Sequence, residues 1–168
     1  MNPELVHSLN SLRILSLDMI TYAKSGHPGI CLGAAPIIYT LYANHLKFNP
    51  KDPDWANRDR FVMSAGHGSA LLYAMLFMVG YDISIDDLVD FRKLNSKTPG
   101  HPEYRVTPGV EVSTGPLGQG FANAVGMALA KKYLSSLIDE EIPKQKILDY
   151  NIYCLVSDGD LMEGIADE

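Results

Sequence analysis

The sequence lacks the features that would place it in a membrane or on a nucleic acid. No stretch approaches the roughly 18 consecutive apolar residues of a membrane-spanning helix, and Met1–Glu4 is not the start of a secretory signal, which opens with a basic region. Against 20 Asp and Glu there are 14 Lys and Arg, a net charge of −6 that does not suit a surface for polyanions. We therefore expect a cytoplasmic protein with neither nucleic acid nor membrane as a partner.

Cysteine is scarce and internal repeats are absent. Cys31 and Cys154 lie far apart, each among apolar residues, which predicts buried reduced thiols without chemistry. No segment is of low complexity and nothing repeats at a fixed period. With 168 residues, 46% of them hydrophobic, the chain is long enough for one sizeable core and too short for two ordinary domains. One globular unit is expected.

Helical periodicity dominates the beginning of the chain. Apolar residues recur at helical spacing from Leu5 to Met19 and predict a helix that ends near Gly26. The segment 33–46 is apolar at most positions and too long for a strand, so it predicts a buried helix with Pro36 in its first turn.

The middle of the chain predicts a strand followed by two helices. A short apolar run at 61–63 is typical of a strand, and the apolar segment 69–79 predicts a helix after a turn. Ser84 and Asp87 have the spacing of a capping box, which predicts the start of a helix that runs to about Asn95.

The last part of the chain indicates the fold class. Prolines and glycines predict irregular backbone over 97–120, and loops of that length are usually functional. Residues 121–137 predict a helix whose small residues let it pack closely against another helix. The unbroken apolar run 150–156 is typical of a strand in the buried middle of a parallel sheet. Strands joined by helical crossovers predict an α/β fold, a parallel sheet with helices on both faces.

Three of the five histidines stand beside glycine in predicted turns: His27, His67 and His101. Glycine permits a ligand to approach the backbone closely, and imidazole offers both hydrogen-bonding roles with a pKa near neutrality. Together they indicate one polar pocket lined by turns. A zinc site is the competing interpretation, but the wide separations lack the close ligand pairs of such sites. His7 and His45 fall within helical patterns and are interpreted as surface or packing residues.

Two further segments place polar groups at the ends of elements. Residues 113–120 form a glycine-rich turn that leads into a helix, whose free amides suit an anionic or polar ligand, although the spacing fits neither the dinucleotide fingerprint nor the nucleotide P-loop. Asp158 follows the last strand, where α/β folds place ligands, and its carboxylate suits Mg²⁺ or Ca²⁺. Glu163 lies five residues further on. An ordinary Asp-Gly turn and an exposed charge are the alternatives for these two residues.

Five motifs, taken in order, resemble the successive landmarks of transketolases. They are Ser25–Gly29 (SGHPG), Ala65–Gly68 (AGHG), Pro99–Glu103 (PGHPE), Ser113–Gly120 (STGPLGQG) and Ser157–Gly164 (SDGDLMEG). Each motif alone is weak, and their order is highly specific. The resemblance covers essentially the whole chain and implies that residues 1–168 are the N-terminal part of the thiamine-diphosphate-binding domain, with later domains absent.

The resemblance implies a role for each site residue. His27 and His101 would bind the sugar substrate, and His27 would also assist proton transfer. Both would be catalytic, together with Glu163, which would meet its neighbour across a dimer interface. The cofactor would be contacted by His67 at the diphosphate, by Gly115, Pro116 and Leu117 along the thiamine, by Asp158 as a metal ligand and by Gly159 beside the diphosphate.

The implied reaction is the transfer of a two-carbon ketol (glycolaldehyde) unit in the pentose phosphate pathway. The donor would be a ketose phosphate such as xylulose 5-phosphate, and the acceptor an aldose phosphate. The cofactors would be thiamine diphosphate, which supplies the electron sink, and Mg²⁺ or Ca²⁺. The resemblance further implies a homodimer for the full-length enzyme, and we expect the 168-residue chain alone to be inactive.

The chain departs from the family pattern at two places. Ser157 stands where the metal-binding motif usually begins with glycine, and we expect a tolerated change because a serine can turn there. The asparagine that closes this motif would lie beyond Glu163, and the chain ends at Glu168. One metal ligand of the family is therefore missing from these 168 residues.

Two other interpretations compete with this one. Another thiamine-diphosphate enzyme, such as 1-deoxyxylulose-5-phosphate synthase or phosphoketolase, has a comparable first domain, but the motifs at 27–29 and 115–120 and Glu163 favour transketolase. Alternatively, the chain is a truncated transketolase-like module that binds or dimerises without activity.

Overall fold

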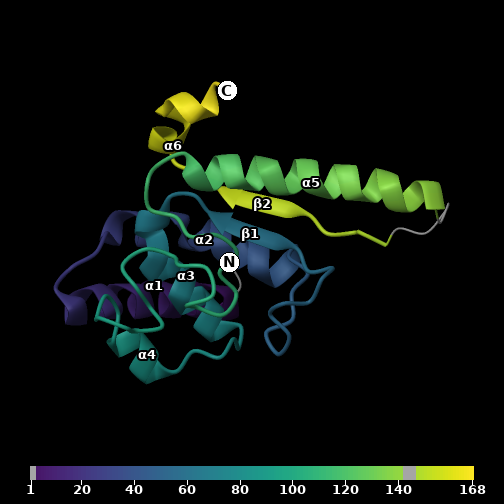
Figure 1. The fold of residues 1–168 in the computed structure, drawn as a ribbon. Coiled ribbons are helices and arrows are strands. Elements are labelled where there is room, and N and C mark those ends of the chain that lie inside the picture. The colour runs from purple at the N-terminus through teal and green to yellow at the C-terminus, as the bar shows by residue number, and fades with distance from the viewer. Residues whose placement is uncertain (1–2, 142–146) are drawn as a thin grey trace.

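The computed structural model describes residues 3–141 and 147–168 (Figure 1). Its elements follow the chain in this order: α1 (Pro3–Ala23), α2 (Pro28–Asn44), β1 (Arg60–Met63), η1 (Gly66–Gly68), α3 (Ser69–Met78), α4 (Ile85–Val89), α5 (Gln119–Glu141), β2 (Ile152–Leu155), α6 (Asp158–Met162) and η2 (Gly164–Ala166). The first helix and both strands lie where the sequence predicts them.

The two strands form a parallel pair that the helices enclose. Arg60 lies opposite Ile152 and Met63 opposite Leu155. α5 runs along one face of the pair, whereas α1, α2 and α3 lie on the other (Figure 1). Parallel neighbours require a crossover connection, which here is the long segment from η1 to α5. This arrangement confirms the predicted α/β class, a parallel sheet with helices on both faces.

The hydrophobic core lies between β1 and the layer of α1, α2 and α3. Every residue of α3 from Ser69 to Leu76 is buried, because α1 and α2 both pack against this helix. The ring of Tyr42 in α2 meets that of Phe61 in β1 edge-on, with centroids 5.7 Å apart. The core thus fixes the strand β1, whose carboxyl end leads into the turn of His67.

α2 begins five residues earlier than the sequence predicted, and Pro36 lies inside it rather than in its first turn. Pro28 occupies the first turn instead, where a proline loses no hydrogen bond. Pro36 has no N–H to donate to the carbonyl of Leu32, one turn before it. The Arg13 Nε of α1 donates to that carbonyl at 3.1 Å, so a neighbouring helix satisfies the group that the proline leaves free.

α4 confirms the predicted capping box but not the predicted length. The hydroxyl of Ser84 accepts from the Asp87 N–H, and the Asp87 carboxylate accepts from the Ser84 N–H. The helix ends at Val89, well before Asn95, because Arg92 and Asn95 both have left-handed backbone angles, φ 66° and 60°. In agreement with the prediction, the backbone from there to α5 contains no helix or strand.

The prediction of tight burial around β2 and α5 is wrong for this part of the chain. β2 is half-buried along its length, and β1 is its strand partner among the described residues. α5 packs mainly on the two strands rather than on a helix, and a Cβ added at Gly126 would meet nothing within 4 Å. Gly126 therefore faces open space.

Both cysteines are free thiols, and Cys154 is less buried than the sequence predicted. Cys31 is buried, Cys154 is half-buried and both are free. Burial raises the pKa of each thiol to about 11, which keeps both protonated at neutral pH. Among residues 3–141 and 147–168, no helix is both long and apolar enough to cross a membrane.

Candidate functional site

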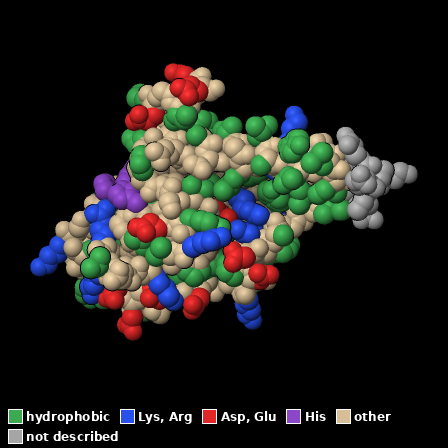
Figure 2. Space-filling view, viewed as in Figure 1, with side chains coloured by type: hydrophobic (Ala, Val, Ile, Leu, Met, Phe, Trp, Pro, Cys, Tyr) green, Lys and Arg blue, Asp and Glu red, His purple; other side chains and the backbone are tan. Residues whose placement is uncertain are grey.

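The three glycine-flanked histidines lie together, as the sequence predicts, although they come from different parts of the chain. His27 is the N-cap of α2 and His67 lies in η1, and their ring centroids are 5.3 Å apart. His101 lies in the loop before α5, where a Cβ added at Gly115 would lie 3.5 Å from its Cγ. Histidine side chains gather in one patch on the face that Figure 2 shows.

Hydrogen bonds from α3 fix the turn that carries His101. The hydroxyl of Ser69 donates to the carbonyl of Gly100 at 2.7 Å, and the hydroxyl of Tyr73 donates to that of His101 at 3.0 Å. Both donors belong to the buried helix at the centre of the core. The irregular loop therefore holds His101 on a rigid support.

The glycine-rich turn of residues 113–120, called the glycine loop below, lies directly on the carboxyl end of β1. A Cβ on Gly66 would approach the Gly115 nitrogen to 2.8 Å, and a Cβ on Gly120 would come within 2.5 Å of the Ser64 Cα. Contacts this short exclude any side chain at either position. The Thr114 hydroxyl also donates to the Met63 carbonyl at 2.9 Å. The loop and the strand thus meet backbone to backbone, beside the histidines.

The surroundings of His27 and His101 keep both imidazoles neutral at neutral pH. Burial lowers the pKa of His27, and the charges of His67 and Arg92 lower it further. Burial also lowers the pKa of His101, with Arg92 as the next contribution. A neutral imidazole can accept a proton or a hydrogen bond from a substrate hydroxyl. The arrangement therefore favours a pair of bases at one end of the site.

Arg92 belongs to this cluster and was not predicted. Its guanidinium donates to the Ser25 hydroxyl at 2.6 Å, next to His27, and its Nε is buried without a hydrogen-bond partner among the described residues. A Cβ on Gly100 would lie 3.5 Å from the Arg92 Cγ. No local pattern indicates this role, because the position depends on the left-handed backbone of Arg92 itself.

The second half of the candidate site begins where β2 ends. Asp158 is the first residue of α6, as its place after the strand predicts, and its side chain is exposed. Gly159 faces the glycine loop, since a Cβ there would lie 3.2 Å from the Leu117 Cδ1. Glu163 lies between α6 and η2, and its Cβ would lie 3.1 Å from one added at Gly118. The glycine loop therefore contacts both the histidine cluster and the segment from Asp158 to Glu163.

Asp160 is a site residue that the sequence interpretation missed. It is fully buried, and its Oδ1 accepts from the Ser64 hydroxyl at 2.8 Å and from the Gly118 N–H at 2.9 Å. Its Oδ2 accepts from the N–H and the hydroxyl of Ser157, the N-cap of α6. Burial alone would raise the pKa of Asp160, but these hydrogen bonds outweigh it and lower the pKa. The Ser-x-x-Asp spacing was the available signal.

The residues present suit an anionic cofactor with a bound cation. Close backbone contacts at Gly66 and Gly120 hold the glycine-rich loop beside the turn of His67, and a glycine-rich loop that opens a helix such as α5 presents backbone N–H groups to an anion. Within the described residues, no group of three or more His, Cys, Asp or Glu has the arrangement of a metal site. Asp158 is an exposed carboxylate, and carboxylate oxygens are the ligands that Mg²⁺ and Ca²⁺ take.

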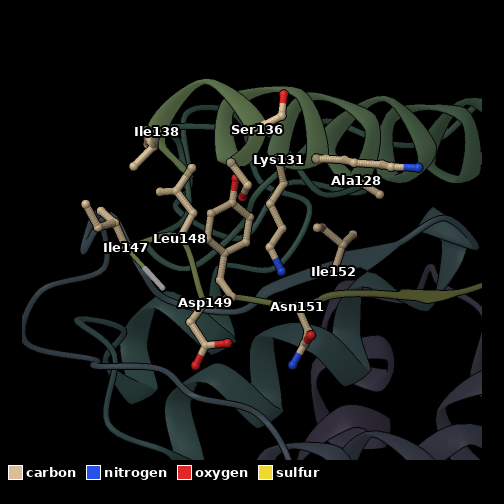
Figure 3. A pocket seen from close by; sticks show the side chains of 12 residues that line it. Ala128, Lys131, Ser136, Ile138, Ile147, Leu148, Asp149, Asn151 and Ile152 are labelled. Carbon is tan, nitrogen blue, oxygen red and sulfur yellow. The ribbon is translucent and has the colours of Figure 1, made fainter. Parts of the chain in front are cut away.

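Two cavities among the described residues lie away from these side chains. A cavity of about 650 Å³ separates the second half of α5 from residues 147–152, and Figure 3 shows the side chains that line it. Lys131 points into the gap and lies 5.3 Å from the centre of the Tyr150 ring. A second cavity, also about 650 Å³, lies between α2 and β2. The lining of neither includes a predicted site residue.

Known proteins are similar to this chain over almost its full length. Residues 6–168 match the family described as "Transketolase, thiamine diphosphate binding domain". A transketolase of Aquifex aeolicus is 60% identical over 160 residues, which are 95% of this chain and 23% of that protein. A transketolase of Geobacillus stearothermophilus is 55% identical over 96% of this chain and 24% of its own.

Solved structures agree with the sequence relatives. The transketolase of Leishmania mexicana superposes with a TM-score of 0.91 at 52% identity, covering 95% of this chain and 23% of its own. A transketolase of Pichia stipitis, in complex with sedoheptulose 7-phosphate, gives 0.89 at 47% identity, over 96% and 23%. The chain spans about a quarter of the length of the relatives it matches.

Proposed function

The chain belongs to the transketolase family, and we propose that it is the front part of the cofactor domain of an enzyme that transfers two-carbon ketol units. The donor is a ketose phosphate such as xylulose 5-phosphate, and the acceptor is an aldose phosphate, as in the pentose phosphate pathway. The observation that carries this proposal is the convergence of His27, His67 and His101 beside a glycine loop that also touches the Asp158 loop.

The proposed roles of the histidines follow from their charge state. His27 and His101 bind the hydroxyl groups of the sugar, and their neutral imidazoles accept hydrogen bonds or a proton from them. His67 turns toward the diphosphate at the start of α3. A cluster of imidazoles beside Arg92 resists further protonation, which suits proton transfer near neutral pH.

The proposed cofactor site joins the two halves. Bound thiamine diphosphate supplies the carbanion and the electron sink for the reaction. Gly115, Pro116 and Leu117 lie along the thiamine, Gly159 lies beside the diphosphate and Asp158 binds Mg²⁺ or Ca²⁺. The exposure of Asp158 and the contact of Leu117 with Gly159 support this arrangement.

We propose a homodimer for the complete protein, with Glu163 at the interface. The exposed apolar residues Val125, Leu129 and Tyr133 lie at helical spacing along α5 and support a covered face there (Figure 2). Since the chain is about a quarter of the length of its relatives, we propose that it does not turn over substrate alone. The cytoplasmic location stays a prediction.

Calorimetric titration with thiamine diphosphate and Mg²⁺ tests the cofactor site. In the complete protein, Asp158→Ala is expected to weaken binding at low Mg²⁺ by about a hundredfold, because the cation loses a direct ligand. Unchanged affinity at every Mg²⁺ concentration would remove Asp158 from the metal site. Turnover of xylulose 5-phosphate by the 168-residue chain alone would contradict the proposal that it is inactive.

A further inference from the structure

Asp160 is a buried carboxylate that joins three segments distant in the sequence. It is 0% exposed, although exposed Asp158 lies only two residues before it. A carboxylate is kept in such a place when donors satisfy its lone pairs. Four donors do so here, from Ser64, Gly118 and, twice, Ser157.

Each of these three partners belongs to a different part of the candidate site. Ser64 follows β1, beside the turn of His67, and Gly118 closes the glycine loop that lies along the proposed thiamine position. Ser157 opens the loop of the proposed metal ligand. We propose that Asp160 is a positioning residue of the cofactor site, which locks the Asp158 loop onto the glycine loop in one fixed arrangement. This inference rests on the proposed function.

The position of Asp158 depends on the hydrogen bonds of Asp160 because α6 is too short to be stable by its own hydrogen bonds. The helix contains five residues, Asp158–Met162, and a helix of this length gains little from its own hydrogen bonds. Its first turn is anchored by Ser157 and Asp160, on either side of the metal ligand. A shift of either anchor therefore moves the carboxylate of Asp158.

The hydrogen bonds require a carboxylate at position 160 rather than an amide. Asparagine offers one acceptor oxygen and an NH₂ group, which only donates. The hydroxyls of Ser64 and Ser157 can turn to accept from that group, but the backbone N–H groups of Gly118 and Ser157 cannot. In either orientation of the amide, one of these two N–H groups faces another donor. Asp160→Asn therefore releases either the glycine loop or the Asp158 loop.

The chain contains a matched control for this substitution. Ser84 and Asp87 make the same capping box at the start of α4. The Asp87 carboxylate accepts hydrogen bonds from Ser84 and faces the charge of Lys97. It receives no hydrogen bond from β1 or from the glycine loop. Asp87→Asn is thus the same substitution in a box of the same design outside the cofactor site, and the amide oxygen can still accept from the Ser84 N–H.

The test is calorimetric binding of thiamine diphosphate to the complete protein at a series of Mg²⁺ concentrations. Groups that orient a metal ligand typically change affinity by about 10- to 100-fold when replaced. We expect Asp160→Asn to raise the Kd at least about tenfold and to shift the Mg²⁺ dependence to higher concentration. Asp87→Asn is expected to stay within about twofold of the parent. Thermal unfolding without cofactor is measured in parallel, because a merely structural role lowers Tm without changing the Kd of the folded protein.

The outcomes separate this inference from the proposed function. If folded Asp160→Asn binds the cofactor as tightly as the parent, Asp160 is not a positioning residue, and the proposed function stands. If the parent itself does not bind thiamine diphosphate, both fail. Should Asp160→Asn not fold, Ser157→Ala decides, with Ser84→Ala as its control. It is expected to weaken binding severalfold, and an affinity equal to that of the control would overturn the inference.

Discussion

The helices α4 and α6 begin with capping boxes of the same design. In both, the serine N–H donates to the aspartate Oδ2 at 2.7 Å, and the serine hydroxyl donates to the same oxygen at 2.8 Å. The return bond, from the aspartate N–H to the serine Oγ, measures 3.1 Å in α4 and 3.2 Å in α6. Nothing in the local geometry distinguishes the two helix starts.

The aspartates differ in what they meet beyond their own helices. The Asp87 side chain is 23% exposed and faces Lys97 across 3.8 Å. Asp160 is fully buried, and its second oxygen takes donors that lie 42 and 96 residues away in the sequence. A local pattern is thus sufficient to start a helix, whereas distant partners decide whether the same pattern also holds a site together.

The two capping boxes should differ most in the stability that is lost when the carboxylate of Asp160 or of Asp87 is removed. Asp160→Ala leaves the N–H groups of Gly118 and Ser157 without acceptors, at about 1–3 kcal/mol each, so we expect a loss of about 3 kcal/mol. Asp87→Ala removes an exposed box and is expected to cost about 1 kcal/mol. Hydrogen exchange in the complete protein measures this as local opening. Protection of residues 115–121 should fall about a hundredfold in Asp160→Ala, and an equal loss in both variants would show that the distant bonds add nothing.

A smaller loss of stability is expected from a substitution at Gly118, the residue of the glycine loop that donates to Asp160 in the capping box of α6. Gly118 has φ 80°, and a Cβ there would lie 2.7 Å from the Ile165 Cγ2. Gly118→Ala is therefore expected to cost about 1–2 kcal/mol through backbone strain and displacement of η2. Gly164→Ala is the control, because a Cβ at Gly164 meets nothing within 4 Å. Thermal unfolding compares them, and similar Tm values for the two variants would contradict the strain.

The smallest effect concerns pH and the exposed box. Burial alone would raise the pKa of Asp87, but hydrogen bonds from Ser84 and the charge of Lys97 lower it below its usual value of 3.8. A carboxyl with a lowered folded pKa stabilises the protein above its unfolded pKa, and this contribution disappears as the pH falls through the folded pKa. Asp87→Asn should lower stability by less than about 1 kcal/mol at pH 7, and the gap to the parent should close below about pH 4. Unfolding midpoints between pH 7 and pH 3 check this, and a constant gap would exclude the pKa shift as its cause.

Local chemistry explains which predictions from the sequence succeeded. The box at Ser84 depends on residues within one turn, so its spacing alone identified it. The approach of His27 to His67 follows from two turns beside the carboxyl end of β1, each flanked by glycine. Asp158 lies at the end of β2 because an apolar run predicted that strand. In each case a pattern within a few residues identified the turn, the strand end or the helix start that carries the residue.

The predictions that failed depended on contacts far away in the sequence. Proline favours a first turn over a helix interior, and the bond from Arg13 supplies the Leu32 carbonyl with the donor that Pro36 lacks. Asp160 was passed over because an Asp-Gly turn accounted for its neighbourhood, while its donors Ser64 and Gly118 lie in other segments. Spacing within one segment carries no information about such partners.

The backbone contacts of Gly66 and Gly120 also restrict which amino-acid substitutions this protein can accept during evolution. Every amino acid that a single nucleotide change can substitute for glycine carries a Cβ, and neither position has room for one. Packing therefore restricts both positions to glycine, because glycine is the only amino acid without a Cβ. A larger residue at either position requires the backbone at the end of β1 and the backbone of the glycine loop to move apart.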